Sequence, residues 1–226
     1  MQNAEIKTVS FCIALFERMV VNMKHDEYDR LYVPNMLLVG SVARNTGKTT
    51  FCTEFIRKWA AQHDIVGIKV TTIYGEKGRC HHGDEGCGVC TDFVGDFEIV
   101  EEFDHSGAKD TSGLLKAGAS KVYWIKATHH CLAEAFGSLI GLIPGNSVIV
   151  CESNALSALL RPAVIVVSSR NDISIEGMKP SAKPMLEKAD YIVDVRDQGK
   201  MQAALDGIIV ESADGGCRLR AAGGRL

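Results

Sequence analysis

The sequence predicts an α/β protein whose mostly parallel sheet carries helices on both faces. Short apolar runs of five or six residues alternate with helical segments along most of the chain. Continuous apolar strands are typical of a parallel sheet that is buried on both sides, and the intervening helices form its crossover connections. The 226 residues suffice for one such domain with an insertion and are too few for two full domains.

Composition narrows the class of protein. Hydrophobic residues make up 46% of the chain and charged residues 23%, as is usual for globular proteins in water. The net charge of −3 gives no reason to expect a nucleic-acid or membrane partner. Of the eight cysteines only three cluster, which favours a metal in the reducing cytosol over a disulfide framework. We therefore expect a cytoplasmic protein.

The first predicted strand, residues 36–39, leads into the most informative stretch of the chain. After Gly40 and Ser41 a loop closes on Gly47-Lys48-Thr49, and a helix is expected over residues 48–62. A strand, a glycine-ended loop and a helix opening with Gly-Lys-Thr form the P-loop arrangement. The strict pattern has a further glycine where this chain has Val42.

This arrangement predicts a site for the phosphates of a nucleotide. Backbone N–H groups at the helix start bind anions, and Gly47 lets the backbone approach them. Lys48 is expected on the β- and γ-phosphates as a catalytic residue, and the Thr49 hydroxyl on Mg²⁺. ATP and GTP both remain candidates. The predicted nucleotide contacts are Ala43, Arg44, Asn45, Thr46, Gly47, Lys48, Thr49, Thr50, Lys69 and Asp172.

A second strand is expected at residues 64–70, followed by a Cys/His-rich insertion at about 72–96. The insertion has no helical or strand period, and structureless loops of that length are uncommon in compact domains. Cys87 and Cys90 have the spacing that lets two thiolates bind one ion; Cys80 and a histidine such as His82 would complete a Cys3His zinc site. The alternatives are an iron–sulfur cluster and a loop of reduced cysteines without metal.

The remaining elements alternate in the same way. Gly118 ends one predicted helix and Pro144-Gly145 ends the next, as expected of residues that stop a helix. Strands are expected at residues 97–101, 121–125, 147–151, 162–167, 191–195 and 207–210, and helices at 109–117, 132–143 and 181–188.

Polar residues follow several predicted strands, where ligands bind in parallel sheets. Glu152 ends an apolar strand and is expected to hold Mg²⁺ directly or through a water; the alternative is an ordinary loop acid. Asp110 either stabilises the start of its helix or faces the phosphates, where it positions Mg²⁺ or the attacking water. Arg170 and Asp172 match only in part the Asn-Lys-x-Asp motif of guanine-binding proteins.

Three motifs together resemble the molybdopterin-guanine dinucleotide biosynthesis protein B (MobB) family. They are SxxxxTGKTTF at residues 41–51, IKVTT at 68–72 and KDTSGLLKAGA at 109–119, and the resemblance spans residues 36 to about 195. It implies a GTP-binding α/β protein, often a homodimer, that assists a nucleotidyltransferase attaching GMP to molybdopterin. Of the basic run that the family carries after its second strand, this chain retains Lys69.

Two other classes of function use the same scaffold. One is a small-molecule kinase or ligase similar to dethiobiotin synthetase or lipid A 4′-kinase, which acceptor-stimulated turnover would identify. The other is a regulator in which metal at the cysteines gates the nucleotide site, which metal-dependent nucleotide affinity would identify.

The expected organisation has three parts. Residues 1–35 form an N-terminal extension, residues 36–211 the nucleotide-binding domain, and residues 212–226 a disordered tail. The apolar run at residues 11–16 is interrupted by Glu17 and Arg18 and is too short to span a membrane.

Overall fold

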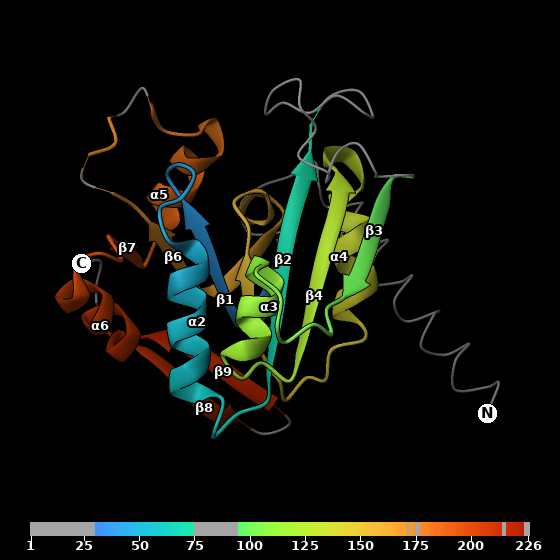
Figure 1. Ribbon diagram of the computed structural model, residues 1–226, viewed down its shortest axis with the longest axis horizontal. Coiled ribbons are helices and arrows are strands. Elements are labelled where there is room, and N and C mark those ends of the chain that lie inside the picture. The colour runs from blue at the N-terminus through green and yellow to red at the C-terminus, as the bar shows by residue number, and fades with distance from the viewer. Residues whose placement is uncertain (1–29, 75–94, 171, 175–176, 214–215, 224–226) are drawn as a thin grey trace.

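The computed structural model describes residues 30–74, 95–170, 172–174, 177–213 and 216–223. Seven strands form one α/β sheet: β1 (Leu31–Ser41), β2 (Ile65–Ile73), β3 (Phe97–Glu101), β4 (Lys121–Thr128), β5 (Val148–Glu152), β6 (Leu160–Ser168) and β7 (Tyr191–Val193). Their order is β3-β4-β2-β5-β1-β6-β7 (Figure 1). All neighbours pair in parallel except β3, which joins β4 antiparallel at the edge. The predicted α/β class with a mostly parallel sheet is confirmed.

Strand β1 occupies the interior of the sheet because it is apolar on both faces. Leu37 and Val39 pack into the core on one face, and Met36 and Leu38 into the core on the other. All four side chains are fully buried. Successive strand residues point to opposite faces, so a strand can be apolar throughout only where both faces are covered. Accordingly, β1 is hydrogen-bonded on both edges, to β5 and to β6.

Helices supply that cover. On one face of the sheet, the helical residues Phe55 and Leu114 pack in the core that contains Leu37 and Val39. On the other face, the helical residues Phe136 and Met185 pack in the core that contains Met36 and Leu38. Figure 1 shows α2 and α3 in front of the sheet and α4 behind it. No helix in the described ranges is long and apolar enough to cross a bilayer. The helices are α2 (Lys48–Trp59), α3 (Asp110–Lys116), α4 (Leu132–Ile140), α5 (Lys183–Lys188) and α6 (Gln198–Gly207).

Strand β1 begins at Leu31, five residues before the predicted start at residue 36. Pro34 cannot donate to a neighbouring strand, and the pairing of β1 with β6 shifts register between Val33 and Leu37. The Asn35 side chain donates to the Ser147 carbonyl at 2.8 Å, which holds the irregular segment against the sheet. The chain before residue 36 therefore contributes to the sheet.

A strand also forms where the sequence predicted a disordered tail. The hairpin of β8 (Ile208–Ala213) and β9 (Gly216–Ala221) is antiparallel. Cys217 and Leu219 face the core, and the intervening Arg218 and Arg220 are exposed. This alternation buries one side of β9 and explains why a Gly- and Arg-containing segment is ordered.

Helix α6 was not predicted either. The Asp197 side chain caps it by accepting from the Lys200 N–H at 3.1 Å. Its buried residues, Met201, Ala204 and Leu205, pack on the same face of the sheet as α2. The helix is therefore held by its cap and by a short apolar stripe.

Candidate functional site

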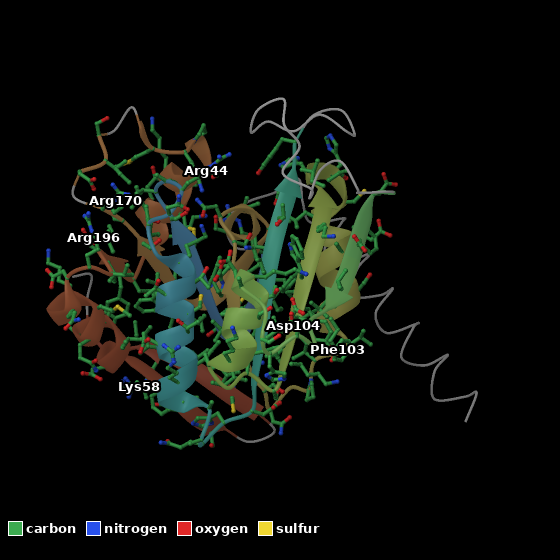
Figure 2. The ribbon with its side chains drawn as sticks, viewed as in Figure 1. Arg44, Lys58, Phe103, Asp104, Arg170 and Arg196 are labelled. Atoms are coloured by element: carbon green, nitrogen blue, oxygen red, sulfur yellow. The ribbon has the colours of Figure 1, made fainter. Side chains whose placement is uncertain are left out.

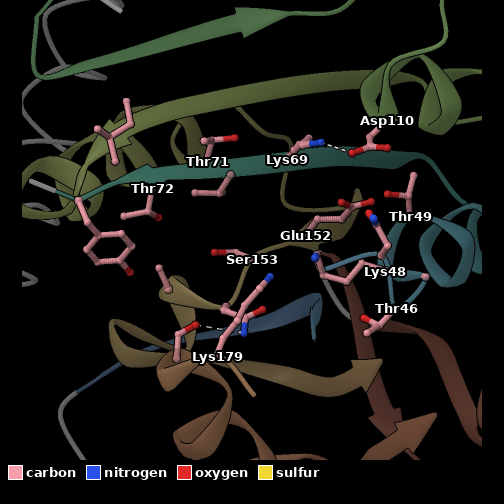
Figure 3. A pocket seen from close by; sticks show the side chains of 18 of the residues that line it. Thr46, Lys48, Thr49, Lys69, Thr71, Thr72, Asp110, Glu152, Ser153 and Lys179 are labelled. Atoms are coloured by element: carbon pink, nitrogen blue, oxygen red, sulfur yellow. Dashed lines mark hydrogen bonds and ion pairs between the residues drawn. The ribbon is translucent and has the colours of Figure 1, made fainter. Parts of the chain in front are cut away.

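A cavity of about 910 Å³ opens at the carboxyl ends of β1, β2 and β5 (Figure 3). Parallel strands end at the same edge of a sheet, so segments far apart in sequence meet there. Lys179 and Ser181, just before α5, form another part of the wall. Nine predicted site residues line the cavity: Asn45, Thr46, Gly47, Lys48, Thr49, Thr50, Lys69, Asp110 and Glu152.

The loop between β1 and α2 turns into the helix through left-handed backbone. Gly47 has φ +93° and Asn45 has φ +54°. A Cβ atom built on Gly47 would lie 2.2 Å from Cγ2 of Val195, so a side chain there is excluded by both backbone and space. No side chain caps α2 within the described residues, which leaves its first N–H groups available to a ligand.

Gly47→Ala is expected to destabilise the fold by about 2–4 kcal/mol, the sum of a left-handed alanine and an overpacked contact with Val195. Chemical denaturation measures the change. Gly95→Ala is the matched control, because Gly95 has φ +100° and nothing within 4 Å of an added Cβ. The control should cost about 1 kcal/mol; equal losses in the two variants would contradict the steric argument.

The start of the loop is fixed by side chains from neighbouring strand ends. Asn154 accepts from the Ser41 N–H at 2.9 Å and donates to the Ser41 carbonyl at 2.8 Å. The hydroxyls of Thr46 and Ser168 hydrogen-bond at 2.7 Å. Asn154 thus holds the loop to the segment after β5.

Two lysines converge on one hydroxyl in the cavity. Lys48 Nζ donates to Ser41 Oγ at 3.0 Å, and Lys179 Nζ donates to the same oxygen at 3.5 Å. Neither lysine forms an ion pair with a described carboxylate. Burial, reinforced by the charges of Lys48 and Arg44, lowers the pKa of Lys179 to about 8. Two lysines in one cavity, neither held in an ion pair with a described carboxylate, favour the binding of an anion.

Lys179→Met is expected to stabilise the unliganded protein by about 1 kcal/mol at pH 7, after allowance for partial exposure. The unfolded chain holds this proton up to about pH 10.5, whereas the folded chain releases it at about 8. The charged lysine therefore opposes folding fully below pH 8. This cost is lost as pH rises from 8 towards 10.5.

Urea denaturation of the Lys179→Met variant and the wild type at pH 7 and pH 10 checks this prediction. The variant's advantage should shrink at pH 10. An advantage that does not change with pH would mean that packing, and not charge, sets it.

Glu152 brings a buried carboxylate to the same cavity. The residue is 3% exposed, and its Oε1 has no hydrogen-bond partner among the described residues. Burial raises the pKa of Glu152, whereas the Thr49 hydroxyl and the charge of Lys69 lower it. An unpartnered carboxylate oxygen in a buried position is costly unless a cation occupies it in the working state. The arrangement fits a divalent cation held between Thr49 and Glu152.

Lys69 and Asp110 form an ion pair across the top of the cavity (Figure 3). Asp110 is also the first residue of α3, so it occupies the helix-start position and lines the cavity at once. The two alternatives for this acid are therefore both compatible with its position. Because Lys69 holds its carboxylate, Asp110 is positioned rather than free to rotate.

Asp172, Ala43 and Arg44 do not line this cavity. Arg170 and Arg196 both pair with the Asp172 carboxylate, and Arg170 chiefly lowers its pKa, to about 2. Figure 2 shows these two arginines on the side of the molecule where Arg44 also lies. The contact of Asp172 with a guanine base stays a prediction.

The predicted zinc ligands Cys80, His82, Cys87 and Cys90 lie outside the described residues, so that site also stays a prediction. Within the described ranges no three His, Cys, Asp or Glu side chains gather around one point. Mg²⁺ does not require such a group, because it binds through one or two carboxylates together with substrate phosphates.

No family model, characterised protein or solved structure matches this chain. The function is therefore inferred from the geometry of the cavity and from the sequence motifs.

Proposed function

We propose that this protein binds a nucleoside triphosphate with Mg²⁺ and hydrolyses it slowly. One observation carries the proposal: Lys48, Thr49 and the buried Glu152 line a single cavity beside the left-handed Gly47. Gly47-Lys48-Thr49 at the start of α2 then acts as a P-loop, with N–H groups and Lys48 on the phosphates.

Each residue has a defined task in this proposal. Lys48 neutralises charge on the β- and γ-phosphates. Thr49 and Glu152 hold Mg²⁺, which supplies further positive charge to the phosphate oxygens. In this proposal the Lys69–Asp110 pair orients the hydrolytic water. Because the Asp110 carboxylate is already paired with Lys69, it is a poor base for the proton of that water, and turnover should be slow.

The resemblance to the MobB family adds a cellular role to the proposal. In that role the nucleotide is GTP, the protein forms a homodimer in the cytoplasm, and its partner is a nucleotidyltransferase in cofactor biosynthesis. ATP remains the alternative nucleotide, because the one predicted guanine contact, Asp172, is paired with Arg170 and Arg196.

A binding titration tests the core of the proposal. Purified protein is titrated with fluorescent ATP and GTP analogues in Mg²⁺ and again in EDTA, and phosphate release is followed separately. We expect saturable binding that weakens without Mg²⁺. Failure of both nucleotides to bind in Mg²⁺ would overturn the proposal.

A further inference from the structure

The cavity continues beyond the charged groups assigned to the nucleotide. Figure 3 shows Lys48, Lys69, Asp110 and Glu152 towards one end, with Thr71 and Thr72 farther along β2. The part of the wall here termed the distal compartment consists of Thr71, Thr72, Tyr74, Ser153, Lys179 and Ser181. Lys179 forms its border with the phosphate site, because its Nζ donates to the Ser41 Oγ that Lys48 also contacts. It contains hydroxyl groups and one lysine, and it has no carboxylate among the described residues.

Two hydroxyl groups of this compartment already accept hydrogen bonds from the protein. Thr71 Oγ1 accepts from Trp124 Nε1 at 3.0 Å, and Ser153 Oγ accepts from the backbone N–H of Leu156 at 3.2 Å. A hydroxyl has one proton to donate. Because these oxygens already accept from the protein, their protons are free to point to a ligand.

Ser181 follows the same pattern. Its Oγ accepts from Asn154 Nδ2 at 3.3 Å. Lys179, two residues earlier, adds a cation that has no ion-pair partner among the described residues. A wall built of donors and one positive charge favours a ligand whose atoms only accept, and a carboxylate is the simplest such group.

The two acids of the cavity also indicate which group of a second substrate would react. They favour a substrate carboxylate over a substrate hydroxyl. An attacking hydroxyl must lose its proton to a base. Among the described lining residues the acids are Asp110, which is paired with Lys69, and Glu152, which the proposed function assigns to Mg²⁺. A carboxylate is already deprotonated at neutral pH and needs no base.

We propose that the distal compartment binds a small carboxylate that accepts the γ-phosphoryl group of the nucleotide. This inference rests on the proposed nucleotide site and adds the class of second substrate. One carboxylate oxygen attacks the γ-phosphorus and forms a new O–P bond. The bond from that phosphorus to the β–γ bridging oxygen breaks, and its electron pair leaves with the nucleoside diphosphate. The products are an acyl phosphate and the diphosphate, and no proton is released or consumed in the transfer.

The site is tested with a probe and a matched control on the full chain saturated with Mg-ADP or Mg-GDP, whichever binds. Amide chemical shifts are followed by NMR during titration with succinate, and separately with butane-1,4-diol, which has the same four-carbon chain without the carboxylates. We expect saturable shifts at Thr72, Ser153 and Ser181 with succinate and none with the diol. Equal shifts with succinate and with the diol, or no shifts with succinate on the saturated protein, would each overturn the carboxylate site.

Lys179→Met should raise the succinate Kd about tenfold or more, because a charged hydrogen-bond donor is lost. Lys183→Met, an exposed lysine four residues away, is the control and should leave this Kd unchanged. Equal effects of the two variants would overturn the role of Lys179. Binding of Mg-ADP and of Mg-GDP is measured first in every sample. Failure of the wild type to bind either one would overturn the nucleotide proposal instead.

The transfer step has its own readout. ATP and GTP are each incubated with the protein, hydroxylamine and a panel of two- to six-carbon carboxylates. Hydroxylamine converts an acyl phosphate into a stable hydroxamate. Hydroxamate above the protein-free level supports transfer. Its absence with every carboxylate that binds would overturn transfer and leave a binding site only.

Discussion

Replacing Lys48 by alanine is expected to lower Mg-nucleotide affinity by about one to two orders of magnitude, since a charged hydrogen-bond donor to phosphate is lost. Turnover should fall by about 10²–10³, because the same charge stabilises the transition state. In the unliganded protein, Lys48 donates only to Ser41 Oγ at 3.0 Å and forms no ion pair with a described residue. The variant should therefore stay folded.

Equilibrium titration and phosphate release measure these two losses, and circular dichroism confirms folding. The control is Lys121→Ala, which removes the same charge from an exposed position. Lys121 is the first residue of β4, so it lies at the amino ends of the parallel strands, whereas the cavity lies at their carboxyl ends. We expect the control to behave as the wild type. A folded Lys48→Ala protein with wild-type affinity and turnover would contradict the proposal that this loop binds phosphate.

Glu152→Gln is expected to retain nucleotide binding and to lose most Mg²⁺-dependent turnover, again by about 10²–10³. Glutamine keeps the shape of the side chain but offers a neutral amide to the cation. Burial raises the pKa of Glu152, so its ionised form opposes folding above that pKa. The neutral variant should accordingly be at least as stable as the wild type at pH 7, and this advantage should fade as the pH falls and Glu152 becomes protonated.

Mg²⁺ titration of phosphate release separates a metal ligand from an ordinary loop acid. The control is Glu98→Gln on edge strand β3. Glu98 pairs with Lys126 and its side chain is 44% exposed, whereas Glu152 is buried. We expect an unchanged Mg²⁺ dependence in the control. The same unchanged dependence in Glu152→Gln would return Glu152 to a structural role.

The grouping of the candidate site was predictable because it follows from topology. Gly47-Lys48-Thr49, Lys69 and Glu152 each come at or after the carboxyl end of a predicted parallel strand. Such ends share one edge whatever the strand order, so no distance is needed to expect their convergence. All of these residues line the one cavity.

What the sequence did not predict depends on tertiary contacts. Lys179 is in no motif, and only the fold brings its Nζ to Ser41 Oγ. Asp172 follows the end of β6, as its motif requires, yet its carboxylate pairs with Arg170 and Arg196 away from the cavity. The position of a strand end can be read from local sequence, but the partners of a long polar side chain cannot.

Helix α6 and strand β9 were not predicted, because their sequence signals are weak. Asp197 is a good helix start, but Gly199 and Gly207 within the following helix lowered its propensity. In β9 the alternation of Cys217 and Leu219 with two arginines covers only six residues. Segments this short gain their order from the core they pack on.

The strand order also sets when the cavity can exist during synthesis. Strand β1 ends at Ser41, whereas its two partners, β5 and β6, begin at Val148 and Leu160. At ordinary translation rates the apolar segment of β1, residues 36–39, waits about 5–20 seconds before either partner has been made. Parallel pairings over such separations form slowly. The strand that carries Glu152 is the first that can pair with β1, so the nascent chain gains its buried acid in the step that begins to cover this apolar segment.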